Sequence, residues 1–366
     1  MGIIRFLLAL SVLIVHSSPI AGIEIVPGRI AVQSFYIISG FYITLIFTEK
    51  YSITSRPFFL FYSNRILRLY PLYALVIVMT VALSIIFGLW LGSYGKLQYY
   101  FDFYANNQAS IYSLLAVAFS NISLIGQDWI TFFNINESGN LYFLGLQTDL
   151  KLQELLLIPI AWTVSVELFF YAVSPFIVTK SKKIIILIIV LVLALRLAFY
   201  FMGISNGFTI YRFAPTELVW FLLGVLSYKL YHQKWLPDKR YGAWLMGVVI
   251  LSLFMYKFLP IDWIVYSLLV ICTPAIFYRI SHHPVDRYIG ELTYPLYISH
   301  LFFMMIVLAN RFPKPVGPGI PLFFMTFMFS ILIYHFFLKP VERLRASRIS
   351  RSEKRNYTTS PKIVSS

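Results

Sequence analysis

Four ionisable side chains lie inside long apolar stretches of this chain, where a charge costs several kcal/mol and therefore marks a candidate site. They are His16, Glu167, Arg196 and His300. With ~1.5 Å rise per residue across a ~30 Å hydrocarbon core, all four fall roughly 15–20 Å from the predicted inner face. This shared depth predicts a polar site inside a helix bundle. A histidine at such a site can take the proton of an attacking hydroxyl, and a carboxylate can orient that histidine.

Each of these side chains also has a structural interpretation. His16 can be a core histidine that bonds to a neighbouring helix, and His300 can simply cap a polar contact. Glu167 can be a purely structural partner of Arg196. Alternatively, the Arg196 side chain can extend to the outer interface. These alternatives stay open at the level of the sequence.

A second group of candidates is basic and lies near the predicted inner face. Arg65 and Arg68 are three residues apart on one side of a helix, and their planar guanidinium groups suit bidentate phosphate binding. Arg5 lies eleven residues before His16, so the two share one helical stripe ~16 Å long. Phosphates of an acyl-CoA would bind at the arginines while its thioester reaches His16. Ordinary anchoring at a cytoplasmic face is the alternative.

The composition indicates that lipid surrounds the elements that position these residues. Of 366 residues, 59% are hydrophobic and 12% are charged, against roughly 25% charged in soluble domains, and the mean hydropathy is +0.76. The net charge of +15 is explained by basic cytoplasmic loops, so no nucleic-acid partner is expected. The single cysteine, Cys272, excludes an internal disulfide, and the His and acidic residues lack the spacing of a metal site.

The apolar pattern predicts an all-α polytopic integral membrane bundle with about ten transmembrane helices and both termini cytoplasmic. In this topology 22 of the 30 Lys and Arg face the inner side. Residues 1–340 form the transmembrane domain, and residues 341–366 form a basic cytoplasmic tail, expected to be disordered from 347. A signal peptide is the alternative for the first segment. The predicted spans are 3–23, 30–48, 69–91, 159–179, 184–203, 214–231, 242–259, 261–280, 290–310 and 320–338.

The long segment 92–158 is predicted to be extracytoplasmic or re-entrant. It contains an apolar stretch, 111–126, which is shorter than the ~17 residues that span a bilayer comfortably. If that stretch crossed the membrane, every later basic loop would change sides, against the positive-inside rule. The aromatic and amide residues of segment 92–158 suit a carbohydrate ligand, and a plain lid is the alternative.

Six segments, in order along the chain, resemble those of the acyltransferase family 3 membrane proteins. They are Arg5–His16 with its Arg-x10-His spacing, Gln33–Phe41, Asn64–Tyr73, Trp162–Tyr171, Arg212-Phe with Gly224, and Leu292–His300. The chain departs from the family pattern at Leu168 and Phe169, where an acidic residue and a glutamine are usual. It departs again at Leu338-Lys-Pro340, where the family has Glu-x-Pro.

The resemblance implies a membrane O-acyltransferase of the bacterial cytoplasmic (inner) membrane. Such a protein moves an acyl group, usually acetyl, from cytoplasmic acyl-CoA to a hydroxyl of an envelope polysaccharide or lipid-linked sugar. Its partners would be acyl-CoA, that glycan and membrane lipid, with no permanently bound cofactor. The expected catalytic residues are His16, Glu167 and Arg5, and those binding the donor are Arg65 and Arg68. The expected supporting residues are Arg196, His300, Tyr294, Ser165 and Tyr171.

Two other functions remain open at this point. A glycan transporter or flippase would use the intramembrane charges for conduction and consume no acyl-CoA. A non-catalytic scaffold would not need His16 at all. Within the enzyme hypothesis, direct transfer and a two-step route through an acyl-histidine both fit the residues.

Overall fold

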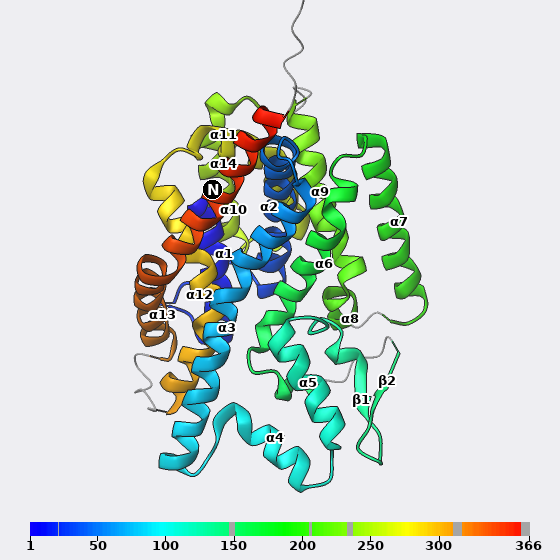
Figure 1. Cartoon of the computed structure of the whole chain (residues 1–366), viewed down its shortest axis with the longest axis vertical. Coiled ribbons are helices and arrows are strands. Elements are labelled where there is room, and N and C mark those ends of the chain that lie inside the picture. Colours follow the sequence, from blue (N-terminus) through cyan, green and yellow to red (C-terminus); the bar gives the residue numbers. More distant parts are fainter. Residues whose placement is uncertain (21, 146–150, 205–206, 233–236, 310–316, 360–366) are drawn as a thin grey trace, which may run out of the picture.

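The computed structural model describes residues 1–20, 22–145, 151–204, 207–232, 237–309 and 317–359. Over these residues the chain forms a helix bundle with a smaller region at one end (Figure 1). Long apolar runs fold as helices because a helix satisfies its backbone hydrogen bonds internally, which lipid cannot do. The bundle helices are α1 (Gly2–His16), α2 (Gly28–Ile46), α3 (Pro57–Leu91), α6 (Trp162–Ile177), α7 (Lys182–Phe201), α9 (Ala214–His232), α10 (Gly242–Met255), α11 (Asp262–Ile280), α12 (Pro284–Ala309) and α13 (Gly319–Ile333).

Helices occupy all ten predicted spans, and seven helical stretches of the described chain are long and apolar enough to cross a membrane. Helices α1 and α10 are apolar but shorter, and α9 is not among the seven stretches. The bundle therefore has the build of a polytopic membrane protein. The count of ten spans and the side on which the termini lie stay predictions. The qualifying stretches are Gly28–Tyr51, Pro57–Leu91, Pro159–Ile177, Lys182–Phe201, Asp262–Ile280, Pro284–Ala309 and Gly319–Ser352.

The first helix is shorter than its predicted span, 3–23, because it ends at His16. Pro19 has no backbone N–H and disfavours the helical conformation at the residue before it, so the chain leaves the helix in this region. The consequence for the site is that His16 lies in the last turn of α1, where its side chain is exposed.

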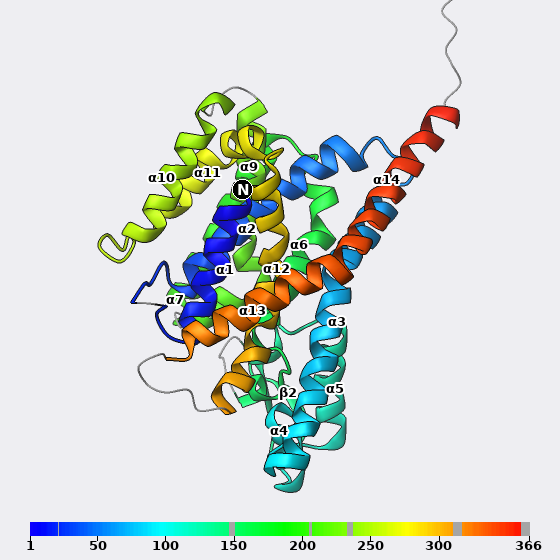
Figure 2. The ribbon, with the colours of Figure 1, turned by 90° about the vertical axis from the view of Figure 1, so that its left-hand side faces the viewer.

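The predicted outer segment, 92–158, has a structure of its own at the end of the bundle opposite to the last helix (Figures 1 and 2). It contains the short strands β1 and β2, which pair antiparallel, while the described chain as a whole has the predicted all-α build. Helix α5 has 13 residues, about 20 Å, and is too short to cross a ~30 Å core. The elements are α4 (Gly95–Ala105), α5 (Ile111–Ser123), η2 (Ile130–Phe132), β1 (Phe133–Ile135), β2 (Leu141–Phe143), η3 (Lys151–Leu155) and η4 (Pro159–Ala161).

The basic tail is helical through Thr359, so the expected disorder from residue 347 is wrong over the described part. Helix α14 (Lys339–Thr359) follows the π-helix η6 (Tyr334–Leu338) directly, and the predicted boundary at 340 falls inside this helical segment. Side-chain hydrogen bonds hold α14 on the start of α3, which a composition rule does not register. The remaining elements are the π-helix η1 (Phe47–Tyr51), α8 (Gly207–Arg212) and η5 (Lys239–Tyr241).

Two glycines let the backbones of α2 and α9 come into direct contact where the helices cross. A Cβ at Gly40 would lie 2.0 Å from the carbonyl oxygen of Phe221, and a Cβ at Gly224 would lie 2.0 Å from that of Ile37. Both glycines belong to segments that carry the family resemblance. Their role is therefore to bring two helices of the core together, as small residues do in membrane bundles.

We expect Gly224→Ala to lower the midpoint of thermal unfolding of the detergent-solubilised protein by more than 5 °C, because the new methyl group must push α2 and α9 apart. Gly247→Ala is the control, since no heavy atom lies within 4 Å of its added Cβ. Fluorescence-detected size-exclusion chromatography after heating measures both. Equal midpoints for the two variants would contradict the close crossing.

Candidate functional site

Two of the four predicted intramembrane residues meet at the end of α1. His16 on α1 and His300 on α12 have ring centroids 5.1 Å apart, and Nε2 of His300 lies 3.3 Å from Nδ1 of His16. His300 is fully buried, whereas His16 is exposed. One ring of the pair is thus accessible and the other is fixed in the core.

The hydrogen bonds of the pair define which nitrogens carry protons when both rings are neutral. Nδ1 of His16 lies 2.8 Å from the carbonyl oxygen of Val12, and Nδ1 of His300 lies 2.6 Å from that of Tyr297. A carbonyl only accepts, so each Nδ1 carries the hydrogen. The single Nδ1–H of His16 is then shared between the Val12 carbonyl oxygen at 2.8 Å and Nε2 of His300 at 3.3 Å. Among the described residues no side chain bonds to Nε2 of His16, whose lone pair is left to act as a base.

The alignment of α1 with α12 is fixed at the other end of both helices. The backbone N–H groups of Gly2 and Ile3 donate to the Asp286 carboxylate at 2.8 and 3.1 Å, and the α-amino group of Met1 also bonds to it. These are N–H groups that the first turn of a helix leaves without partners. The carboxylate therefore caps α1 and ties it to the first turn of α12.

Glu167 does not contact the histidine pair, contrary to the expectation that it orients His16. Its Oε1 accepts hydrogen bonds from Ser39 at 2.9 Å and from Tyr171 at 2.5 Å. The ring of Tyr171 in turn lies under the guanidinium of Arg65, 5.7 Å from its centre. Glu167 is thus connected to the arginines at the end of the bundle that is predicted to face the inner side.

Helix α12 carries two tyrosines between those arginines and His300. The hydroxyl of Tyr294 donates to the carbonyl oxygen of Leu69 on α3 at 2.9 Å. The hydroxyl of Tyr297 lies 2.8 Å from that of Thr163 on α6. Tyr294, expected as a supporting residue, therefore joins α12 to α3 next to Arg68. Tyr297 was missed, although it lies three residues before His300 in a segment that carries the family resemblance.

The predicted donor-binding arginines lie together with acidic residues that the sequence analysis missed. Arg65 is 5% exposed, and it packs its guanidinium 5.7 Å from the ring of Phe61 as well as over Tyr171. Arg68 interacts electrostatically with Glu291, Glu167 and Glu342. Arg5 acts on Glu291 in the same way, so it belongs to this group and not to the histidine pair. Glu291 lies in a predicted apolar span, and that position was an available signal.

Arg196 belongs to a separate buried cluster, so the alternative in which it pairs with Glu167 is wrong. Its Nη1 lies 3.2 Å from Oε1 of Glu217, which is fully buried. Gln33 donates to both oxygens of the same carboxylate at 3.0 and 3.1 Å, and Trp220 donates at 3.4 Å. Glu217 was missed, although an acidic residue within the predicted span 214–231 is itself the signal.

Ser165, another expected supporting residue, bonds to the outer segment. Its hydroxyl donates to Oδ1 of Asp128 at 2.7 Å, and Asp128 is 3% exposed. Burial raises the pKa of the Asp128 carboxyl to about 6, because removal from water disfavours the charged form. Ser165 thus fastens α6 to the outer segment.

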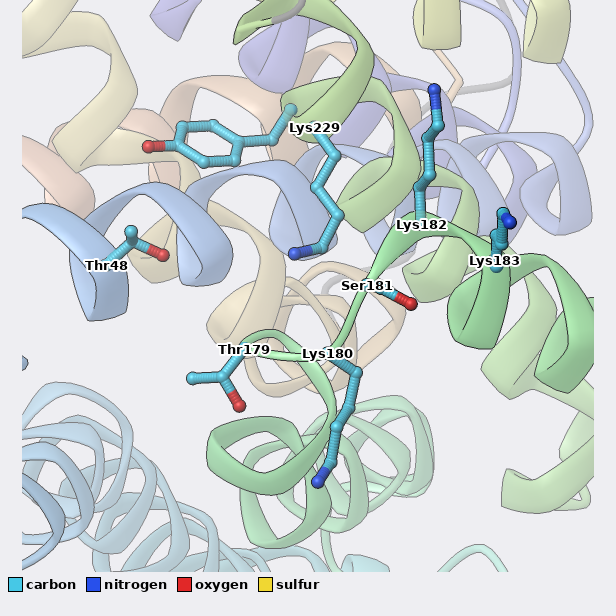
Figure 3. A pocket seen from close by; sticks show the side chains of 8 residues that line it. Thr48, Thr179, Lys180, Ser181, Lys182, Lys183 and Lys229 are labelled. Atoms are coloured by element: carbon cyan, nitrogen blue, oxygen red, sulfur yellow. The ribbon is translucent and has the colours of Figure 1, made fainter.

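An open pocket of about 600 Å³ lies at the junction of η1, the α6–α7 connection and α9 (Figure 3). It contains none of the predicted site residues. Figure 3 shows the Lys229 side chain extending between Thr48 and Ser181. Basic side chains at this point agree with an inner membrane surface. The lining residues are Thr48, Thr179, Lys180, Ser181, Lys182, Lys183, Tyr228 and Lys229.

Long apolar helices with a few buried charged side chains between them have the build of an integral membrane protein. The family model of the acyltransferase domain, family 3, matches residues 1–335. The chain belongs to this family and is a membrane acyltransferase, which confirms the resemblance carried by the six segments. No curated protein and no solved structure matches the chain. Among the described residues, no group of three His, Cys, Asp or Glu side chains could hold a metal ion.

We expect Asp128→Asn to stabilise the protein in a pH-dependent way. The pKa of about 6 in the folded protein exceeds the ordinary 3.8, so the unfolded chain loses its proton first and stability falls as pH rises from about 4 to 6. Asparagine avoids the buried charge, which costs about 3 kcal/mol above pH 6. Unfolding midpoints at pH 8 and pH 4 measure this. A gain of equal size at both pH values would contradict the shifted pKa.

Removing one charge of the Arg196–Glu217 pair should cost more than removing both. Arg196→Leu leaves the Glu217 carboxylate buried without a cation, for a loss of about 3–5 kcal/mol, and the double variant with Glu217→Gln should recover most of it. Arg29→Leu is the control, because its pair with Asp262 is partly exposed and is worth about 0–1 kcal/mol. Denaturant unfolding in detergent measures all three. A double variant less stable than Arg196→Leu would refute the pairing.

Proposed function

We propose that this membrane acyltransferase is an O-acetyltransferase. It moves an acetyl group from cytoplasmic acetyl-CoA to a hydroxyl of an envelope polysaccharide or lipid-linked sugar, in the bacterial inner membrane. The observation that carries the proposal is the histidine pair, in which Nε2 of His16 is left with a lone pair on an exposed ring. A neutral imidazole in this state is suited to take a proton at neutral pH.

The transfer proceeds by attack of the sugar hydroxyl on the thioester. Nε2 of His16 takes the hydroxyl proton while the oxygen forms a bond to the acetyl carbonyl carbon. The C–S bond then breaks, and the CoA thiolate leaves with the proton that the imidazolium returns. His300 is a positioning residue, because its Nε2 shares the Nδ1–H of His16 with the Val12 carbonyl oxygen, and together the two acceptors keep the proton on that nitrogen.

The donor would enter from the end of the bundle where the arginines lie. Arg65 and Arg68 would bind the phosphates of acetyl-CoA, with Arg5 beside them. Arg5 and His16 are ~16 Å apart along α1, a separation that the long flexible arm of the donor is built to cross. Glu167, Tyr171 and Tyr294 connect the arginine end to the middle of the bundle, which supports a role in lining this route.

The acceptor would approach from the opposite end. The outer segment, 92–158, lies there and contributes aromatic and amide side chains, and Asp128 with Ser165 ties it to α6 (Figure 1). This arrangement supports a glycan acceptor at the outer face. It also separates the two substrates in space until they meet at the level of His16.

We expect His16→Ala to reduce transfer of radiolabelled acetyl from acetyl-CoA into the glycan fraction of membranes by at least 100-fold, at matched protein level. His283→Ala is the control, because this exposed histidine lies in the turn before α12 and its loss should leave transfer unchanged. Unchanged transfer in His16→Ala would exclude His16 as the base. Absence of transfer by the unmodified protein, together with movement of glycan across the membrane, would favour the transporter alternative.

A further inference from the structure

The arginines at the inner end receive a further member from the last helix. Helix α14 is fastened to the start of α3 by Arg348, whose Nη1 donates to Asn64 at 3.1 Å and whose Nη2 donates to Ser63 at 2.8 Å. One turn further on, the hydroxyls of Ser352 and Ser55 lie 3.0 Å apart. These contacts hold α14 beside the part of α3 that carries Arg65 and Arg68 (Figure 2).

Arg345 projects from α14 into this group. It interacts electrostatically with Arg68, Arg65 and Tyr51, and its backbone carbonyl accepts from Asn64 at 3.5 Å. Its Nε is buried and has no hydrogen-bond partner among the described residues, and the same holds for Nε of Arg65. Two buried guanidinium donors without partners are costly in the absence of a ligand, and both lie in one cluster.

The charges of the cluster are unbalanced. Arg5, Arg68 and Arg345 act on Glu291, and Arg68 also acts on Glu342 and Glu167. Arg65 adds a fourth positive charge beside Arg345. Glu291 and Glu342 also act on each other, and like charges so close together repel. Four guanidinium groups therefore face at most three negative charges. A ligand with several negative charges would complete the cluster, and arginine forks suit phosphate oxygens in particular.

We propose that Arg345 is a further phosphate-binding residue of the donor site, so that helix α14 is part of that site. The inference rests on the proposed function, which supplies acetyl-CoA as the phosphate-bearing donor. The unpartnered Nε–H groups of Arg65 and Arg345 donate to phosphate oxygens of the bound donor. The last helix thereby controls donor affinity, while the histidine pair at the other end of α1 controls the chemical step.

The test is binding of CoA to the full-length protein in detergent by isothermal titration calorimetry, together with the KM for acetyl-CoA. We expect Arg345→Ala to weaken CoA binding and raise KM by about 10- to 100-fold, the effect of losing one charged hydrogen-bond donor, with kcat little changed. Arg345→Lys should recover only part, because an ammonium lacks the fork. Arg343→Ala is the matched control, since Arg343 is exposed on the same helix.

The outcomes separate this inference from the proposed function. Weaker CoA binding in Arg345→Ala but not in Arg343→Ala supports the inference. Equal binding by unmodified protein and Arg345→Ala overturns it and leaves the proposed function intact. No CoA binding by the unmodified, correctly folded protein overturns the proposed function and the inference with it. A drop in kcat at unchanged KM would also overturn it, because it would assign Arg345 to the chemical step.

Discussion

The contact between the first turns of α1 and α12 is the constraint on which the site depends. The Asp286 carboxylate caps the backbone of Gly2 and Ile3, and only a glycine fits at position 2, where a Cβ would lie 1.7 Å from the Asp286 carbonyl oxygen. Fourteen residues separate Gly2 from His16, and fourteen separate Asp286 from His300. Two neighbouring helices tied at one end therefore bring the histidines to the same level about 21 Å further on.

The charges of the interior are divided into groups with different tasks. Arg196 and Glu217 neutralise each other inside the bundle, with Gln33 and Trp220 completing the carboxylate's hydrogen bonds. A buried pair satisfied in this way is a structural element. The arginines of α1, α3 and α14 outnumber the carboxylates around them. The exposed ring of His16 keeps a free lone pair on Nε2. The proposed function uses both groups. The arginines at one end of α1 would bind the phosphates of the donor, and His16 at the other end would take the proton of the acceptor hydroxyl.

The sequence predicted which segments are helices and several of the polar residues, because apolar length and intramembrane charge are local properties. Arg5 and His16 share α1 as the spacing of eleven residues indicated, and His300 joins His16. The partners were not predictable in the same way. Whether Glu167 meets Arg196, a histidine or a tyrosine depends on the rotation and register of helices that are far apart in the chain, and no local pattern encodes these. Glu217 and Glu291 were visible as acids in apolar spans, yet their partners were not.

For the C-terminal tail, the sequence led to a wrong prediction of the local structure itself. Its composition of Ser, Lys and Arg predicts disorder, since such a segment cannot bury enough apolar surface to fold alone. In the structure, α14 packs instead on the start of α3, where Arg348 donates hydrogen bonds to Asn64 and Ser63. Tertiary contacts of this kind decide the state of a polar segment and cannot be read from its own residues.

The most direct test of the account is a double-mutant cycle on the histidine pair, measured as the rate of acetyl transfer. In the proposed mechanism His300 acts only through the proton on Nδ1 of His16, so its role should disappear once His16 is removed. The account predicts that His300→Gln slows transfer in the unmodified protein, and that the double variant is no slower than His16→Ala alone. Losses that multiply in the double variant would show that the two histidines act independently and would contradict the account.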